Sequence, residues 1–495
     1  MEFGTLISLA LYFLLMLGIG FYAYRKSTSD IEGFMLGGRS LSPSVAALSA
    51  GASDMSGWML MGLPGAMYIS GVSSLWIAAG LVIGAFLNYL IVAPRLRTYT
   101  EVADDSITLP DFFENRFNDK SRMLRIVSSI VIVVFFTLYT SSGIVAGGKL
   151  FESSFGLNYE VGLYVTAGVV VAYTLFGGFL AVSLTDFVQG CIMFIALVLV
   201  PAVAISEVGG LTEMQGSINQ INPELFDLFN GMSVIGIISA MAWGLGYFGQ
   251  PHIIVRFMAI RSVKDMPTAR RIGMSWMIVS IIGAMATGLA GIAYVAKTGM
   301  QLDDAETIFI VLSQLLFNPL VAGFLLAAIL AAIMSTISSQ LLVTSSSLTG
   351  DFYKAFLHRE ASEKRLVLVG RISVALVAIV AIYLAYDRNS TILTLVSNAW
   401  AGFGAAFGPV VIGSLYWSKM TRNGALAGMV SGALTVLLWI YAPITIDGQS
   451  LSSVMYEIVP GFIICTLAIY FVSKFSGSVD EKMNNQFDEM LTHHK

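Results

Sequence analysis

The sequence predicts an all-α polytopic membrane protein with 13 transmembrane helices, and two observations carry this prediction. First, 56% of the 495 residues are hydrophobic and 12% are charged, with a mean hydropathy of +0.79. Soluble domains carry about 25% charged residues. Second, the apolar residues gather in segments of the length that crosses the ~30 Å hydrocarbon layer as a helix. The predicted spans lie near residues 5–24, 43–67, 72–93, 126–148, 158–178, 185–206, 233–255, 273–296, 317–349, 370–386, 392–417, 424–442 and 454–473.

The distribution of basic residues predicts the orientation of these spans. An odd number of spans places the two termini on opposite sides of the membrane. With the N-terminus outside, only Lys149, Lys297 and Arg388 of the 27 Lys and Arg lie in outer segments. Cytoplasmic segments are the ones that accumulate basic residues. We therefore expect an outer N-terminus and a cytoplasmic C-terminus.

The second span, Pro43–Met67, carries Asp54 near its middle and reads PSVAALSAGASDMSGWMLMGLPGAM. A carboxylate at the bilayer centre costs roughly 2.5 kcal/mol or more on insertion scales. The Gly and Ser residues around it are poor helix formers, and a helix interrupted there exposes backbone polar groups, which membranes tolerate only around a cavity. The stretch indicates an ion or solute site. The alternative is a small-residue packing face with Asp54 as a buried hydrogen-bond anchor.

Three polar positions of the first half each allow two interpretations. Arg39 follows Gly37 and Gly38 and is either an ordinary cytoplasmic flank or a gate charge at the inner mouth. Tyr139 and the hydroxyl residues after it lie inside the fourth span, where they serve either helix packing or a polar site. Asp186 is expected to open the sixth span, where the helix dipole alone favours a carboxylate. Its second interpretation is a contact for an ion leaving towards the cytoplasm.

Two segments outside the spans carry no predicted chemistry. The loop that begins near residue 100 and ends near residue 125 is amphipathic and mixed in charge, which is typical of a solvated interfacial helix. Residues 476–495 form a short polar cytoplasmic tail. Function is therefore expected within residues 1–475, interpreted as a single membrane domain.

The seventh span contains a second interruptible helix, MAWGLGYFGQPHIIVRF. Three glycines and Pro251 within eight residues weaken its interior. Trp243 and Tyr247 place aromatic faces within the same two turns.

The two interruptible helices stand five spans apart, so each begins a run of five, residues 43–206 and 233–417. Repeats with an odd number of spans must be inverted relative to each other. Interrupted helices at matching positions of inverted halves indicate a transporter site at the midplane. The spans near 5–24, 424–442 and 454–473 are then additions to this core.

The ninth span offers oxygen ligands for a cation. Ala332, Ser335 and Thr336 stand at positions i, i+3 and i+4 and share one helix face. Two hydroxyls together with carbonyls freed by a broken helix make a cage of neutral oxygens, which suits a hard cation. The alternative is that each hydroxyl bonds its own helix.

At these residues the chain resembles the sodium:solute symporter family, and in particular its proline-transporting branch. The resemblance covers the chain from about Leu6 to Phe475. The stretches that carry it are LGGRSL, LSAGASDMSGWMLMGLPGA, RIVSSIVIVVFFTLYTSSGIVAG, GGFLAVSLTD, GLGYFGQPHI, AAIMSTISSQLLV and AWAGFGAAFGPVV followed by YWSKMTRNGALAGM.

The resemblance implies a fold and assigns roles to residues. The implied fold is a five-plus-five inverted-repeat core of the leucine-transporter type, with one helix before it and two after. The implied sodium ligands are the carbonyls of Ala52, Met55 and Ala332 and the hydroxyls of Ser335 and Thr336. The implied substrate residues are Ser56, Gly57, Tyr139, Trp243, Tyr247 and Pro251. The implied coupling and gating residues are Asp54, Asp186 and Arg39.

These observations together predict an electrogenic symporter of a bacterial cytoplasmic membrane that carries Na⁺ and L-proline inwards. Another small solute, such as a different amino acid, betaine or a carboxylate, is the alternative within transporters. A membrane-embedded enzyme or a sensor is a further alternative. An enzyme requires an intramembrane histidine cluster or paired carboxylates, and His252 with the three other histidines offers no such pattern. No enzymatic activity is therefore expected.

Overall fold

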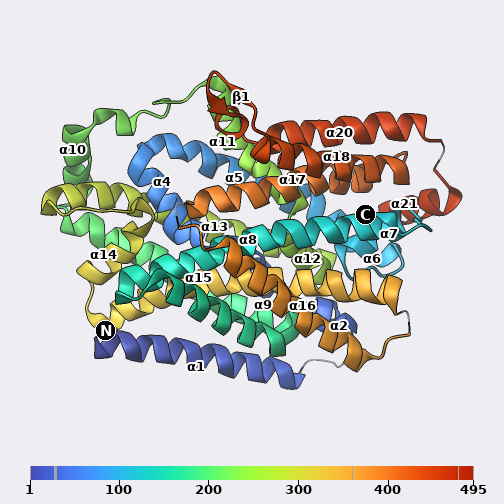
Figure 1. The fold of residues 1–495 in the computed structure, drawn as a ribbon, viewed down its shortest axis with the longest axis horizontal. Coiled ribbons are helices and arrows are strands. Elements are labelled where there is room, and N and C mark those ends of the chain that lie inside the picture. The colour runs from blue at the N-terminus through green and yellow to red at the C-terminus, as the bar shows by residue number, and fades with distance from the viewer. Residues whose placement is uncertain (1, 27–30, 359, 389, 478, 494–495) are drawn as a thin grey trace.

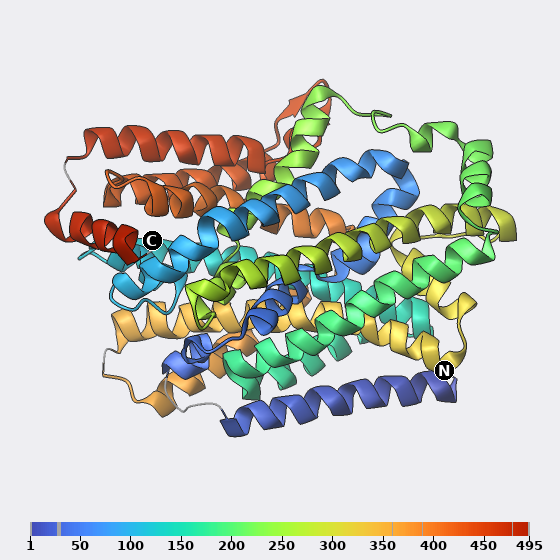
Figure 2. The ribbon, with the colours of Figure 1, turned by 180° about the vertical axis from the view of Figure 1, so that it is seen from behind.

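The computed structural model describes all residues except 1, 27–30, 359, 389, 478 and 494–495. Long helices run along one common direction and form an elongated bundle (Figures 1 and 2). Helix α1 begins at one end of the bundle, and α21 lies at the opposite end (Figure 1). The helices of the first half are α1 Phe3–Lys26, α2 Ile31–Leu36, η1 Gly37–Arg39, α3 Pro43–Asp54, η2 Trp58–Gly62, α4 Leu63–Ser70, η3 Gly71–Ser74, α5 Leu75–Leu87, η4 Asn88–Val92, α6 Ala93–Val102, α7 Leu109–Arg116, α8 Met123–Phe155, α9 Tyr159–Glu207, α10 Leu211–Ile221 and η5 Pro223–Phe226.

The second half is helical as well, apart from one short hairpin, whose two strands pair antiparallel with Thr445 opposite Ser450. Its elements are α11 Val234–Met241, η6 Ala242–Gly249, α12 Pro251–Ala259, η7 Val263–Asp265, α13 Met266–Thr298, η8 Ala305–Thr307, α14 Ile308–Leu316, α15 Pro319–Ser346, η9 Ser347–Leu357, α16 Glu363–Leu384, α17 Ile392–Tyr416, α18 Arg422–Tyr441, β1 Thr445–Ile446, β2 Gln449–Ser450, α19 Leu451–Val454, α20 Ile458–Phe475 and α21 Glu481–His493.

Ten helices among the described residues are long and apolar enough to cross a membrane, which confirms the polytopic helical class. The predicted spans near 43–67, 158–178 and 233–255 coincide with interrupted or shorter helices. The count of thirteen spans therefore stays a prediction.

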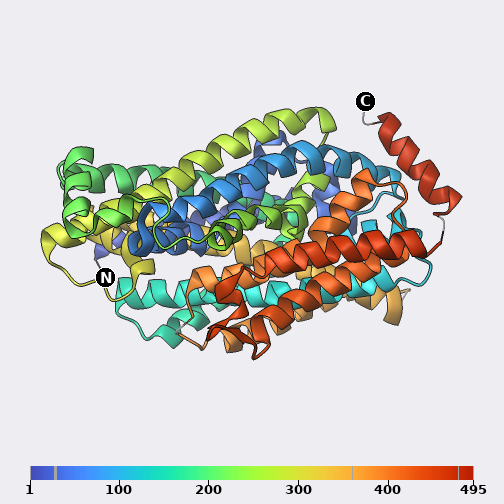
Figure 3. The same ribbon diagram turned by 90° about the horizontal axis from the view of Figure 1, so that it is seen from above.

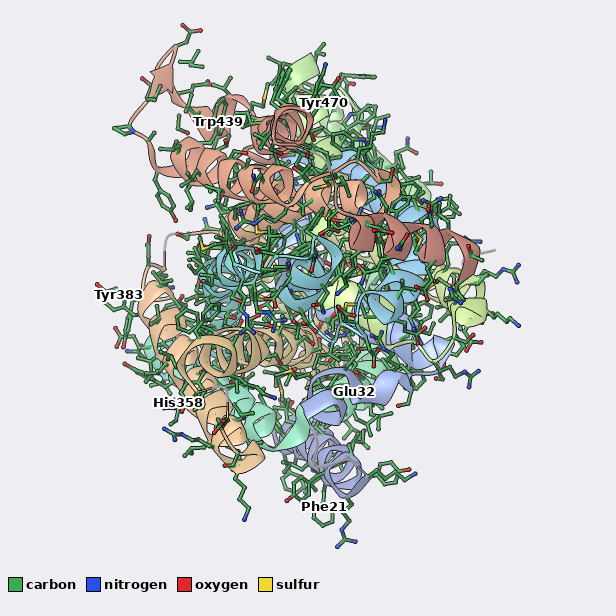
Figure 4. The ribbon with its side chains drawn as sticks, turned by 90° about the vertical axis from the view of Figure 1, so that its right-hand side faces the viewer. Phe21, Glu32, His358, Tyr383, Trp439 and Tyr470 are labelled. Atoms are coloured by element: carbon green, nitrogen blue, oxygen red, sulfur yellow. The ribbon has the colours of Figure 1, made fainter. Side chains whose placement is uncertain are left out.

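The centre of the bundle is α15, whose most apolar stretch is 83% buried. It packs against α1, α8 and α9, while α17 packs against α8 and the pair α18 and α20. Viewed from above, α18 and α20 lie side by side along one edge (Figure 3). The outer surface carries aromatic side chains that point away from the bundle, among them Phe21, Tyr383 and Tyr470 (Figure 4). Together with the many other exposed apolar side chains of the helices, this surface is typical of one that faces lipid.

The first predicted helix break is present in the structure. Helix α3 ends at Asp54, Met55 has φ −82° and ψ 81°, and helical structure resumes at Trp58. The small residues predicted to weaken this helix therefore surround a real interruption.

The second break is a stretch of 3₁₀-helix, η6, between two α-helices. Gln250 is extended, with φ −77° and ψ 108°, and α12 begins at Pro251. The glycines of η6 allow close packing. A Cβ atom on Gly244 would lie 2.2 Å from the carbonyl oxygen of Gly80, and one on Gly84 would lie 2.2 Å from the carbonyl oxygen of Gly244. The second break is thus held against α5 through backbone atoms.

Two segments that the sequence predicts to be polar and cytoplasmic each bury apolar side chains. Helix α7 is not solvated, because Phe112 and Phe113 are fully buried and the helix packs against α8. The tail contains a helix, α21, which packs on α6, where the ring of Phe487 contacts that of Tyr99. Burial of apolar side chains on one face of each segment outweighs their overall polarity.

Candidate functional site

The two helix breaks meet at Asp54, which is buried. Its Oδ2 atom accepts a 2.6 Å hydrogen bond from the hydroxyl of Tyr247 in the second break. Its backbone carbonyl accepts bonds from Trp58 Nε1 at 3.0 Å and from the hydroxyl of Tyr139 at 3.3 Å. Asp54 is thus bonded to residues of three separate segments. Asp54 is therefore a buried hydrogen-bond anchor, and Tyr139, which the sequence assigns either to helix packing or to a polar site, is one of its partners.

The predicted oxygen cage lies between α3 and α15. The hydroxyl of Ser335 donates to the carbonyl of Ala52 at 2.7 Å and to that of Ala332 at 3.2 Å. The hydroxyl of Thr336 lies 3.5 Å from the same Ala52 carbonyl. Met55 is the first residue beyond α3 and is buried. Contacts across the two helices distinguish this arrangement from hydroxyls that bond only their own helix.

Ser56 and Gly57 form the gap between α3 and η2. The amide of Ser56 donates to the Asp54 carbonyl at 3.0 Å. A Cβ atom on Gly57 would lie 2.8 Å from that of Ala146. The missing side chain therefore lets Gly57 pack closely against α8, the helix that carries Tyr139. This places three of the predicted substrate residues along one interface.

Trp243 and Tyr247 are fixed by aromatic contacts that the sequence does not reveal. The ring of Trp243 stacks on Tyr456 at 5.4 Å and 30°. Its carbonyl accepts a 2.7 Å bond from Trp400 Nε1, and the Trp400 ring meets Tyr247 edge-on at 5.0 Å. Trp400 belongs to the stretch AWAGFG that carries the family resemblance, whereas no local pattern marks Tyr456.

Asp186 differs from its predicted setting. The helix resumes at Gly178, which has φ 59° and ψ −175°, so Asp186 lies about two turns inside it and not at its first turn. Its Oδ2 atom is 3.1 Å from Arg256 Nη2, and neither side chain is exposed. Ser49 donates to the same oxygen at 2.8 Å. The ion pair with Arg256 stabilises the carboxylate, and the helix dipole argument does not apply.

Arg39 bonds Thr100 of α6, the helix against which α21 packs. Its guanidinium donates to the carbonyls of Met258 and Ser106, each at 2.8 Å, and pairs with Asp105 at 3.0 Å. Burial lowers the pKa of Arg39, the nearby Arg97 adds to this, and Asp105 opposes it. Arg39 thus joins the segment before α3 to α12 and to the loop after α6.

A charged cluster that sequence reasoning missed joins α7, α8 and η9. Arg125 of α8 pairs with Asp111 and with Glu114 on α7, and its Nη1 lies 3.5 Å from Asp351 in η9. Thr108 donates to Asp351 at 3.0 Å. The cluster lines a cavity of about 320 Å³. A narrower cavity shares Thr108 with it and reaches Pro251.

Interrupted helices with buried polar atoms at their breaks define this chain as a membrane transporter of the broken-helix class. The model of the sodium:solute symporter family matches residues 34–432, and the chain belongs to that family.

Known proteins similar to the chain agree in length as well as in sequence. It is 60% identical over 473 residues to the osmoregulated proline transporter OpuE of Bacillus subtilis, covering 96% of this chain and 95% of that one. It is 57% identical over 491 residues to sodium/proline symporter 2 of Staphylococcus saprophyticus, covering 98% and 96%. A solved Na⁺-coupled sialic acid symporter shares the fold, with a TM-score of 0.81, 18% identity and coverage of 97% and 99%.

Proposed function

We propose that this chain is a secondary active transporter that couples Na⁺ to the uptake of L-proline by alternating access. The observation that carries the proposal is the convergence of Ser335 and Thr336 on the Ala52 carbonyl at a helix break. Relatives at 57 and 60% identity that are named as proline transporters support proline as the substrate.

Na⁺ is assigned to the cage between α3 and α15. Its ligands are the carbonyls of Ala52, Met55 and Ala332 and the hydroxyls of Ser335 and Thr336. The hydrogen bonds among four of these residues support the assignment, since each such bond is exchanged for a bond to the ion when the ion binds. Neutral oxygens hold a hard cation weakly enough to release it.

Proline is assigned to the space around the two breaks. Its carboxylate is expected at the backbone amides of the helix break near Ser56 and Gly57, because helix N-termini favour anions. Its apolar ring is expected against the faces of Trp243 and Tyr247. Tyr139 and Pro251 complete the set. Asp54, bonded to Tyr247, is proposed to couple the two ligands.

One Na⁺ per proline supplies enough energy for accumulation. A potential of ~100 mV contributes about 2.3 kcal/mol per charge, and a tenfold sodium gradient contributes about 1.4 kcal/mol. Together these give near 3.7 kcal/mol, enough for roughly 500-fold accumulation of a zwitterion of zero net charge. Uptake is therefore expected to collapse when either gradient is removed.

Opening towards the cytoplasm is assigned to the end of the bundle that carries α21. The Arg125 cluster and Arg39 bridge segments there, and the narrow cavity from Pro251 ends at Thr108 beside the cluster. We propose that these contacts break when the inner path opens. Asp186 then meets Na⁺ on its way out.

The proposed architecture is one domain, residues 1–475, with thirteen spans and a cytoplasmic tail at 476–495. Residues 43–206 and 233–417 form inverted repeats, and the spans near 5–24, 424–442 and 454–473 lie outside them. The proposed orientation has the N-terminus outside. A reporter fused after Lys495 is expected to be shielded in intact cells, and labelling from outside would overturn the orientation.

Uptake into proteoliposomes tests the function directly. The purified chain is expected to accumulate labelled proline when Na⁺ is outside, and no accumulation is expected when K⁺ replaces it. A panel of amino acids, betaine and carboxylates added as competitors tests substrate identity. If another solute competed more strongly than proline at equal concentration, the substrate assignment would be wrong.

A further inference from the structure

One tryptophan of α17 contacts the second helix break at several points. The indole of Trp400 donates through Nε1 to the Trp243 carbonyl at 2.7 Å, and its ring meets that of Tyr247 edge-on at 5.0 Å and 85°. The Trp400 carbonyl accepts a 3.1 Å bond from Gln250 Nε2. These contacts extend from Trp243 to Gln250, so one residue of α17 is joined to the break along its length.

The fit between this indole and the break is close. A Cβ atom on Gly246 would lie 1.8 Å from Trp400 Nε1, so a side chain at position 246 and the indole exclude each other. One on Gly404, also in α17, would lie 2.8 Å from the Cα atom of Gly246. The indole therefore occupies the space beside Gly246, where it contacts both the backbone of Trp243 and the ring of Tyr247.

The bond to the Trp243 carbonyl matters because the break is not a regular α-helix. Residues 242–249 form the 3₁₀-helix η6, and the backbone hydrogen bonds of a 3₁₀-helix have poorer geometry than those of an α-helix. A donor from α17 therefore adds a constraint that the backbone of η6 provides less well. The residues held in this way, Trp243 and Tyr247, are the two whose aromatic faces are assigned to the ring of proline.

Trp400 acts on a ligand only through these two residues. An indole has a single hydrogen-bond donor, and that of Trp400 is taken by the Trp243 carbonyl. The residue is also 1% exposed, so it offers a ligand neither a polar atom nor an open face. Packing alone is the alternative role. In that case a smaller ring at position 400 would lower the amount of folded protein and leave the choice of ligand unchanged.

We propose that Trp400 is a positioning residue that sets the ring-size specificity of the proline site. By fixing Trp243 and Tyr247 relative to each other, it keeps the site fitted to a five-membered ring. An apolar pocket discriminates one methylene group by about 10- to 200-fold, and it does so only when supporting residues hold its walls in place. This role rests on the proposed use of proline by the chain.

Competition between two ring sizes tests this role. Uptake of labelled proline into proteoliposomes with the full-length chain is inhibited either by unlabelled L-proline or by L-pipecolate, which carries the same charges on a six-membered ring. The readout is the ratio of the two half-inhibiting concentrations. The parent is expected to favour proline about tenfold or more. In Trp400→Phe, which lacks the Nε1 donor, this ratio is expected to be smaller by about fivefold or more.

The ratio separates positioning from packing, because a loss of folded protein lowers uptake and leaves the ratio unchanged. Trp76→Phe is the matched control. Its indole also donates to a backbone carbonyl, that of Leu228 at 2.9 Å, but in an exposed position, so it is expected to keep the parental ratio. An equal ratio in the parent and Trp400→Phe would overturn the role of Trp400, and so would a parent that accepts both rings equally.

If Trp400→Phe does not fold, Gln250→Leu replaces it. This variant removes the bond to the Trp400 carbonyl and keeps a side chain of similar size. The ratio is then expected to fall by about twofold or more, and an unchanged ratio would overturn the role of Trp400. A parent that takes up no proline would instead overturn the proposed function, and the positioning role with it.

Discussion

The hydroxyl of Tyr247 and Oδ2 of Asp54 lie 2.6 Å apart, and this hydrogen bond joins the two interrupted helices. Asp54 follows Ala52 of the oxygen cage by two residues, and Tyr247 follows Trp243 by four. The bond thus connects the position assigned to Na⁺ with the position assigned to proline. Coupling between two ligands is reciprocal, so weakening it must change the effect of each on the other.

Tyr247→Phe tests this connection. Without the donor, a carboxylate oxygen of Asp54 loses its partner, at a cost of roughly 1–3 kcal/mol. We expect the factor by which Na⁺ raises the affinity for proline to fall about fivefold or more. Proline binding measured over a range of Na⁺ concentrations gives this factor. Tyr159→Phe is the control, because its hydroxyl bonds the Ala385 carbonyl far from both breaks. A Tyr247→Phe curve equal to that of the control would contradict the connection.

Thr336 distinguishes a sodium ligand from a hydroxyl that serves packing. Removing one of about five oxygens weakens a small cation site. Thr336→Val is therefore expected to lower the affinity for proline at low Na⁺, and this affinity is expected to recover at high Na⁺. Thr336→Ser keeps the oxygen and should be mild. Transport assays at several Na⁺ concentrations measure this. If Thr336→Val showed the same sodium dependence as the parent, Thr336 would not be a sodium ligand.

Trp243→Ala is expected to raise the KM for proline about tenfold or more, while the half-saturating Na⁺ concentration changes little. The reason is that the indole provides an aromatic face and not a cation ligand. Tyr456→Phe keeps the stacking partner and should be mild, whereas Tyr456→Ala should resemble Trp243→Ala. Initial rates measured against each ligand separate these effects. Equal changes for both ligands would argue against a direct contact with proline.

Asp351→Asn tests the inner closure. Losing one carboxylate from the Arg125 cluster weakens the bridge from α8 to η9, and disrupting a buried pair costs several kcal/mol. We expect faster alkylation of a cysteine placed at Ser346, which lines the inner cavity, in a background where Cys191 and Cys465 are Ala. Glu152→Gln breaks an exposed pair with Arg388 and serves as the control. Equal alkylation rates in both variants would show that the cluster does not close the path.

Acidification tests the anchoring of the loop before α8. Burial raises the pKa of Asp119, but hydrogen bonds from Ser121 and the Leu124 amide and the charge of Arg422 outweigh it and hold the pKa below its ordinary value. A lowered folded-state pKa stabilises the native state above about pH 4. That contribution is lost as pH falls further, through the folded-state pKa. The melting-temperature difference between the parent and Asp119→Asn should therefore shrink below about pH 4. A difference that stays constant to pH 3 would contradict this.

Local composition was sufficient to locate both helix breaks. Gly, Ser and Pro weaken a helix, and the two stretches rich in them contain the non-helical residues Met55 and Gln250. The spacing of Ser335 and Thr336 also follows from helix geometry. Their contact with Ala52 depends on which helix packs opposite, and the family resemblance supplied that information.

Partners distant in the sequence could not be found this way. Arg256 at the end of one span and Tyr456 at the start of another carry no local pattern, and their settings depend on helices that pack against them. Asp186 was misplaced because helical structure resumes directly at Gly178. The composition of residues 476–495 predicts a polar tail, but Met490 and Phe487 of α21 are buried.

The backbone contact between Gly84 and Gly244 has a mechanical consequence. A side chain at either position would separate the two segments, so these glycines let the backbones of α5 and η6 pack in direct contact. Helix α5 continues through η4 and α6 without interruption, and Arg97 on α6 donates to the Ile260 carbonyl at 2.6 Å. Residues 75–102 form one continuous helical segment, so a tilt of this segment at Gly84 would also displace Thr100, which bonds the Arg39 guanidinium.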